Sequence, residues 1–506
     1  MSRLDNVPLI VILMGIGAAA MLVPMAHGLL IGDGRVVQVF GMSAALFLFI
    51  AMMIGFALSG RPSRSPERSH LVALVGAFTV LPLMLAVPFE QVLRTTSFTN
   101  AWFEMVSSIT TTGATLFEPE RLPAPLHVWR ALVGWLGGFL IWVAAFALLA
   151  PMHLGGFEVI GTDRFGAAVR LGRRPGNVTV SHPRVRIRHY TTQFLPIYAG
   201  LTGILLVGLL MLGEAPTTAF CHSLSTLASS GISPLRSMEE SSAGMAGECL
   251  IFVFFIFAIT RITFSGPFNS HWGRTLLRDP ELRIAALVAV LLPSLLFLRH
   301  WVGAYEVNTV AELPSAINAL WGATFSVISF LTTTGFVSAE WSISSSWSGL
   351  QTPGLILLGL GLIGGGVATT ASGVKLLRVY ALYRHSAREL ERLVYPRSVG
   401  GAGSTERDLR TRGAYVAWIF FMLFATSLTA VAVILSLAGL AFDESIVMSI
   451  AALSNTGPAA GVVLDHPVTY SSLGDPGKFT LIFAMALGRL ETLAILAMFN
   501  PHFWRG

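Results

Sequence analysis

Four short polar clusters, each ending in glycine, contain the residues of this sequence whose types and spacing best suit chemistry. Their other members have small hydroxyl or amide side chains and no charge. Such residues form helix poorly, but they suit an extended backbone that points its carbonyl oxygens at a ligand. Within a membrane, rings of backbone carbonyls bind dehydrated cations. The clusters are Thr111-Thr112-Gly113, Ser229-Ser230-Gly231, Thr333-Thr334-Gly335 and Asn455-Thr456-Gly457.

The composition predicts that these clusters belong to a membrane protein. Of the 506 residues, 54% are apolar and only 12% are charged, and the mean hydropathy is +0.70. Soluble domains carry about 25% charged residues. A membrane must be crossed by helices of about 20 apolar residues or by a closed barrel, and the long apolar runs favour helices. We therefore predict an all-α polytopic membrane protein.

Apolar segments of two lengths alternate along the chain. Long segments predict ten transmembrane helices, at about residues 7–31, 37–58, 71–93, 126–150, 192–213, 246–265, 281–303, 350–383, 414–440 and 478–499. Shorter segments lie at about residues 98–112, 217–229, 316–333 and 444–455, and each leads into one of the polar clusters. Because they are too short to cross a bilayer, we expect them to be re-entrant helices.

The order of long helix, short helix, polar cluster and long helix occurs four times. Repetition of one unit predicts four pseudo-symmetric helix–pore loop–helix repeats around one central pore, with the four clusters meeting there. Small polar residues that aid helix packing would explain any one cluster, but not four in matching positions. The expected segments are an N-terminal transmembrane hairpin (1–60) and repeats at 70–155, 190–266, 281–385 and 413–506.

The charged residues predict the orientation. Basic residues gather between helices two and three, four and five, six and seven, and eight and nine, within residues 61–68, 164–188, 274–283 and 375–412. The positive-inside rule then places these connections and the N-terminus in the cytoplasm, so the net charge of +6 is no sign of nucleic-acid binding. Acidic residues such as Glu118 and Glu120 fall on the other side, either as ordinary loop residues or as a vestibule that attracts cations.

Two further features suggest control of the pore. The eighth helix is interrupted at residues 364–373, and irregular backbone at membrane depth occurs only where protein or a water-filled cavity surrounds it. We expect a gating loop there, although a packing kink is the alternative; the residues are Gly364, Gly365, Gly366, Thr369, Thr370 and Gly373. Arg489 lies deep in the last span, where it either faces the pore below the clusters or pairs with a distant acid. Glu104, within the first short helix, is expected to bind backbone behind the first cluster.

The cluster motifs resemble the pore segments of the Trk/Ktr/HKT potassium transporter superfamily. They read Ile-Thr-Thr-Thr-Gly-Ala-Thr at 109–115, Ser-Thr-Leu-Ala-Ser-Ser-Gly-Ile-Ser at 225–233, Leu-Thr-Thr-Thr-Gly-Phe at 331–336 and Leu-Ser-Asn-Thr-Gly-Pro at 453–458. Leu-Gly-Arg-Leu-Glu at 487–491 and the final residues 499–505 resemble the end of a TrkH-type subunit, and the resemblance spans the whole chain.

The resemblance implies a gated, channel-like subunit for potassium uptake in the bacterial inner membrane. It also implies a homodimer that associates with a cytosolic, nucleotide-binding regulatory ring protein. In that superfamily, serine in place of the first cluster glycine goes with sodium transport, so glycine at all four positions favours K⁺ as the transported ion. A sodium- or proton-coupled secondary transporter remains the alternative. A membrane enzyme is disfavoured, because no group of His, Asp, Glu or nucleophilic residues gathers at one depth.

Overall fold

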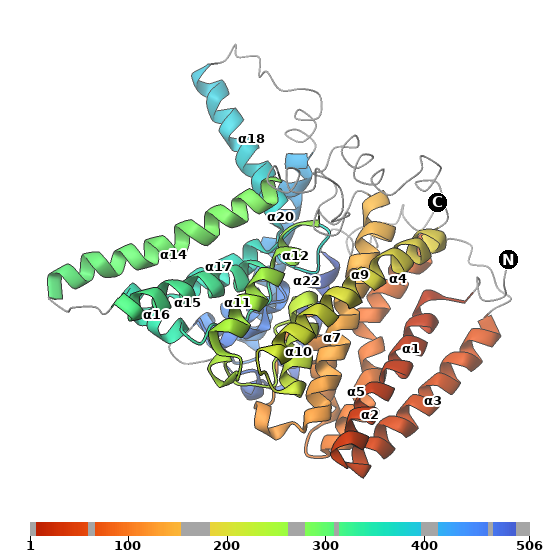
Figure 1. The fold of residues 1–506 in the computed structure, drawn as a ribbon. Helices are drawn as coiled ribbons and strands as arrows, with labels where there is room; N and C mark the ends of the chain where they lie inside the picture. The colour runs from red at the N-terminus through yellow and green to blue at the C-terminus, as the bar shows by residue number, and fades with distance from the viewer. Residues whose placement is uncertain are drawn as a thin grey trace.

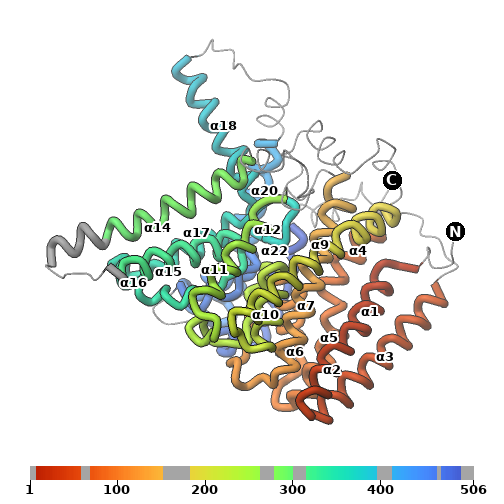
Figure 2. Tube along the Cα trace, viewed as in Figure 1, coloured from red at the N-terminus to blue at the C-terminus, as the bar shows by residue number. Residues whose placement is uncertain are grey.

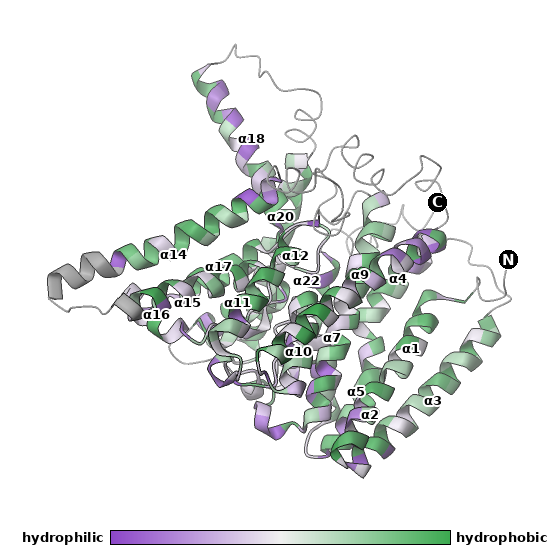
Figure 3. Ribbon diagram, viewed as in Figure 1, coloured by the Kyte–Doolittle hydropathy of each residue, from purple (hydrophilic) through white to green (hydrophobic). Residues whose placement is uncertain are grey.

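Helices form the whole framework of the part of the protein that the structure describes. The computed structural model describes residues 7–58, 66–152, 183–261, 279–307, 313–395, 413–463 and 469–491. No strand occurs among these residues, and the helices lie side by side in a bundle with apolar outer surfaces (Figures 1 and 3). The all-α membrane fold predicted from the sequence is confirmed. The final motif at 499–505 lies outside the described residues.

The N-terminal hairpin covers one edge of the bundle. It consists of α1 (Leu9–Ala20), α2 (Leu22–Ile31) and α3 (Gly34–Leu58), and α3 packs along both α1 and α2 (Figure 1). Side chains such as Phe49 and Phe56, which are 58% and 79% exposed, point away from the protein. Exposed apolar surface of this extent fits contact with lipid.

The remaining helices follow the predicted repeats. The first contains α4 (Pro66–Thr79), α5 (Leu81–Leu93), α6 (Phe98–Ile109) and α7 (Ala124–Ala144), and the second contains α9 (Pro183–Met211), α10 (Pro216–Ala228), α11 (Gly244–Phe254) and α12 (Ile256–Ile259). The third contains α14 (Pro280–Val307), α15 (Leu313–Leu331), α16 (Trp341–Ser348), α17 (Gly354–Ile363) and α18 (Leu376–Val394), and the fourth contains α20 (Ala414–Leu437), α21 (Phe442–Leu453) and α22 (Asp475–Leu490).

In each repeat the helix that leads into the polar cluster packs between two other helices of the same repeat. Helix α6 packs against α5 and α7, α10 against α9 and α11, α15 against α14 and α17, and α21 against α20 and α22 (Figure 2). The sequence favours these starts locally, since Ser97 caps the first turn of α6 and Pro216 begins α10. The four predicted re-entrant helices are therefore present, and each ends at its polar cluster.

Seven helices in the described residues are long and apolar enough to cross a membrane. The predicted spans at 246–265, 350–383 and 478–499 are represented there by shorter helices, Gly244–Ile259, Gly354–Ile363 and Asp475–Leu490. The second of these ends at the predicted interruption. Helix α18, which follows the interruption, carries many charged side chains and projects from the bundle (Figure 3), so the apolar span does not continue to residue 383.

Candidate functional site

The four polar clusters share one backbone geometry. Directly after each short helix, the residue two positions before the glycine adopts a left-handed conformation, with φ of 53° at Thr111, 50° at Ser229, 57° at Thr333 and 52° at Asn455. The next amide donates to a carbonyl five residues earlier in every copy: Thr112 to Ser107 (2.8 Å), Ser230 to Ser225 (3.0 Å), Thr334 to Ser329 (2.9 Å) and Thr456 to Ala451 (2.8 Å). This bond pattern is the Schellman helix ending.

This conformation is strained for residues other than glycine. A threonine in the left-handed region is destabilised by about 1–3 kcal/mol, and such strain persists only where the surroundings enforce it. Hydroxyl pairs at 2.8 Å (Thr110–Thr112) and 3.0 Å (Thr332–Thr334) brace two of the copies. Strain repeated at four equivalent positions is typical of a functional site rather than of a turn.

The clusters from the four repeats meet in a closed ring. Each glycine packs closely on the next cluster or on the residue that follows it. A Cβ atom would collide with the Ser230 carbonyl at Gly113, with the Thr334 carbonyl at Gly231 and with Ala114 at Gly457, and at Gly335 it would lie 3.0 Å from Pro458. The Gly457 amide donates to the Thr112 carbonyl at 2.7 Å, and the Asn455 side chain donates to the Thr112 hydroxyl at 2.9 Å. These two bonds join the fourth repeat to the first.

The centre of the ring is buried and offers oxygen atoms. Eleven of the twelve predicted cluster residues that line it are buried and Gly231 is half-buried, and none is charged. Within the described residues, no donor reaches the carbonyl oxygens of Thr111, Ser229, Thr333 or Asn455. Buried carbonyls normally have a partner, so an equivalent acceptor in each repeat suits a shared ligand. The C-termini of four helices also end here, and their partial negative charge favours a cation.

A cavity of about 420 Å³ borders the ring. All four cluster glycines line it, namely Gly113, Gly231, Gly335 and Gly457. At its rim, Arg236 contacts Glu120 at 2.5 Å and Glu118 at 3.9 Å. The hydrogen bond to Glu120 raises the pKa of Arg236, so this side chain stays positive. The predicted negative vestibule is therefore partly neutralised, which the sequence did not indicate.

The interrupted segment between α17 and α18 lies directly against the ring. The Ser372 amide donates to the Thr333 hydroxyl at 3.0 Å, and the Thr370 hydroxyl donates to the carbonyl of Leu227, near the end of α10, also at 3.0 Å. The Thr369 hydroxyl reaches the Ala258 carbonyl at 3.0 Å. The six residues predicted for gating, from Gly364 to Gly373, are therefore brought together next to the second and third clusters. Gly364 and Gly373 contact each other at the two ends of the loop, and the other four contact the second repeat.

Arg489 binds this same segment. Its guanidinium donates to the Thr370 carbonyl at 2.8 Å and to the Ser372 hydroxyl at 2.7 Å, and the side chain is buried. Within the described residues no carboxylate pairs with it, because Glu491 instead binds Arg378 at 2.6 Å. The structural ion pair considered as the alternative for Arg489 does not occur in the described part of the chain.

Buried ionic residues around the site bind backbone, and sequence reasoning found only one of them. Glu104 accepts from the Leu116 amide at 2.6 Å, as expected, and pairs with Arg130 at 3.0 Å, which was missed. Glu248 accepts from the Ala339 amide at 2.6 Å, and Glu281 from the Val367 amide at 2.7 Å. The sequence signal that could have identified these residues is a single acidic residue within an apolar stretch.

Two basic residues lie where the interrupted segment passes into α18. Their place in the sequence favours an anchor at the cytoplasmic interface, with a contact to the gate as the alternative, and both Lys375 and Arg378 are in fact buried. The Lys375 ammonium donates to the Ala371 carbonyl within the loop, and the Arg378 guanidinium lies 3.8 Å from the centre of the Phe420 ring. Their charges are satisfied inside the protein, so no water-facing position is needed.

Fold and site together define a polytopic membrane protein in which four re-entrant helices present a ring of backbone oxygens. The sequence profile of the TrkH family, described as "Cation transport protein", matches residues 190–505. The chain belongs to this family of cation transport proteins.

Individual relatives match along nearly the whole chain. The Trk system potassium uptake protein TrkH of Vibrio parahaemolyticus is 30% identical over 98% of each chain, and that of Salmonella typhimurium is 29% identical over 96% of each. The crystal structure of the potassium transporter TrkH from Vibrio parahaemolyticus is similar to this fold, with a TM-score of 0.79, 27% identity and full coverage of both chains.

Proposed function

We propose that this chain mediates potassium uptake through the inner membrane as a gated, channel-like subunit. The observation that carries the proposal is the closed ring of four equivalent clusters, each with a backbone carbonyl that no donor among the described residues reaches. A K⁺ ion that enters the ring exchanges water for these carbonyl oxygens and is stabilised by the ends of four helices. The relatives named as potassium uptake proteins support potassium as the ion.

The interrupted segment is proposed to close the pore beneath the ring. Its contacts with Thr333 and Leu227 support a position at the exit of the ring, and in this proposal Arg489 adds a positive charge that repels cations and holds the segment. Opening then requires these bonds to break together.

The proposal also includes the orientation of the chain in the membrane and its partners. The basic connections favour a cytoplasmic N-terminus, and the family resemblance favours a homodimer with a cytosolic nucleotide-binding ring protein. Helix α18 continues directly from the interrupted segment and projects from the bundle, so it offers a route by which such a partner would move the gate.

Reconstitution in liposomes tests the ion and the mechanism. Under potassium/sodium bi-ionic conditions, the reversal potential should follow the potassium gradient. Gly113→Ser should move it toward zero, because a side chain at this left-handed residue, with φ of 74°, collides with the Ser230 carbonyl. Gly200→Ser on α9 is the matched control, because a Cβ atom added there would have no neighbouring atom within 4 Å. A current that follows a sodium or proton gradient would instead support coupled transport.

Deletion of residues 365–372 tests the gate. Gly364 and Gly373 lie in contact, so the deletion can close without displacing α17 or α18. Potassium flux should rise in the deletion variant. Unchanged or lower flux in a monodisperse variant would argue against a gating role.

A further inference from the structure

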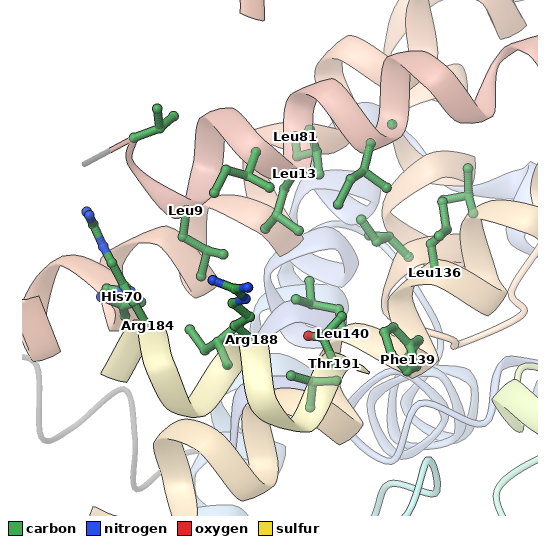
Figure 4. Close-up of a pocket in the computed structure, with 18 of the residues that line it drawn as sticks. Leu9, Leu13, His70, Leu81, Leu136, Phe139, Leu140, Arg184, Arg188 and Thr191 are labelled. Carbon is green, nitrogen blue, oxygen red and sulfur yellow. The ribbon is translucent and has the colours of Figure 1, made fainter. Parts of the chain in front are cut away.

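An apolar groove runs between the N-terminal hairpin and the first two repeats. Its volume is about 400 Å³, and it is lined by side chains of α1, α5, α7 and α9, together with Ile109 at the end of α6 (Figure 4). Pockets of roughly 300–1,000 Å³ take small-molecule ligands. The potassium pathway does not include this groove, because it lies behind α7.

The lining suits a hydrocarbon chain. Along most of its length it consists of aliphatic and aromatic side chains, among them Leu13, Leu81, Leu136 and Phe139 (Figure 4). Ile12 and Ile16, at its edge, are each 46% exposed toward the outside of the bundle. A groove that is apolar within and open beside lipid-facing residues is continuous with the acyl region of a bilayer, and each CH₂ group buried there contributes about 0.8 kcal/mol.

One end of the groove is basic. Arg184 and Arg188 are four residues apart on α9, so they share a helix face, and both line the groove, Arg188 beside Leu9 and Arg184 beside His70 of α4 (Figure 4). Arg186, between them, faces the opposite way and donates to the Ala147 carbonyl at 2.9 Å. Within the described residues no carboxylate pairs with Arg184 or Arg188. Two guanidinium groups at the end of an apolar groove match a phosphate joined to an acyl chain.

We propose that this groove binds an anionic phospholipid, with one acyl chain between α1 and α7 and its phosphate held by Arg184 and Arg188. The basic end lies in the connection assigned to the cytoplasmic side, where anionic lipids attract basic residues between helices. That placement rests on the proposed orientation, whereas the binding itself does not.

The bound chain would support the ring from behind. Ile109 lines the inner part of the groove and is the last residue of α6, directly before the first cluster. Gly137 of α7 packs on the Ile109 carbonyl. The lipid therefore packs against α6 and α7, the two helices that position Thr111.

Lipid titration by native mass spectrometry tests the proposal on the full-length, delipidated protein. The probes are phosphatidylglycerol and phosphatidylcholine with identical acyl chains. Phosphatidylglycerol should bind more tightly than phosphatidylcholine. The double substitution R184Q/R188Q should weaken phosphatidylglycerol binding by about 30-fold, as expected for the loss of two basic contacts near a membrane surface. R388Q/R392Q on α18, another pair four residues apart, should bind as the unsubstituted protein does.

A second variant tests the apolar part. Leu13→Trp should fill the groove and weaken both lipids, while the melting temperature stays within a few degrees. Equal affinity for both lipids, unchanged binding in R184Q/R188Q, or an equal loss in R388Q/R392Q would overturn the proposal. So would a Leu13→Trp variant that loses dimer but keeps its lipid affinity, because a second copy of the chain would then be the occupant. None of these results depends on potassium flux.

Discussion

Arg489 offers the most direct test of the proposed gate. Its guanidinium makes two bonds to the interrupted segment, at 2.8 Å to the Thr370 carbonyl and 2.7 Å to the Ser372 hydroxyl. Replacement by alanine removes both bonds and the positive charge beneath the ring. The segment should then leave its observed position more readily, and cations should meet less repulsion.

The size of the effect follows from these two bonds. Hydrogen bonds to charged groups contribute about 1.5–3 kcal/mol each, while hydrogen bonds in membrane proteins average about 0.6 kcal/mol. We therefore use about 1.5 kcal/mol for each bond, or about 3 kcal/mol in total, which changes the open-to-closed ratio on the order of a hundredfold. Arg489→Gln keeps a donor without the charge and should give an intermediate change.

Single-channel recording in planar bilayers measures this ratio as open probability. The open probability of Arg489→Ala should rise until the open state dominates, with a melting temperature close to that of the unsubstituted protein. Arg392→Ala is the control, because this exposed side chain on α18 binds Glu389 and no other residue in the described part of the chain. A folded Arg489→Ala protein with unchanged open probability and conductance would refute the proposed role.

Three further predictions concern the framework and the entrance. Gly137→Val should abolish recovery of monodisperse protein, because its side chain would collide with the Ile109 carbonyl, whereas Gly203→Val, with no atom within 4 Å, should purify normally on size-exclusion chromatography. Glu104→Gln should lower the melting temperature, since breaking a buried ion pair costs about 3–5 kcal/mol; a melting curve that does not move would show that Arg130 needs no partner. Arg236→Gln should raise potassium conductance in dilute salt by leaving Glu118 and Glu120 unpaired at the cavity rim. That gain should vanish near 1 M salt, where screening acts within about 3 Å.

The sequence predicted the framework well because membrane burial leaves strong local signals. Apolar length separates spanning helices from short ones, so the four re-entrant helices were placed to within a few residues. The interruption after residue 363 was also visible, since its small residues cannot continue an apolar helix. The conducting role of the clusters and the gating role of the loop remain predictions.

The contacts that hold the site were not visible because they join residues far apart in the chain. Glu491 lies two positions from Arg489, yet it binds Arg378 in another repeat. Lys375 and Arg378 are basic residues at a helix start, which normally indicates an interface, and only the folded chain shows that acceptors for both lie inside. The Arg236 ion pairs likewise connect the loops of two repeats.

The ring is symmetric in its backbone but not in its side-chain partners. The hydroxyl of Thr333 accepts the Ser372 amide, whereas the equivalent hydroxyl of Thr111 has no partner among the described residues. Only the third repeat contributes the interrupted segment, so any movement of that segment reaches the ring first at Thr333. Four equivalent carbonyls suit an ion that needs similar ligands on every side, while a single attached loop suits a gate that must not disturb all four. In the proposed mechanism, the departure from fourfold symmetry therefore separates ion binding from its control within one chain.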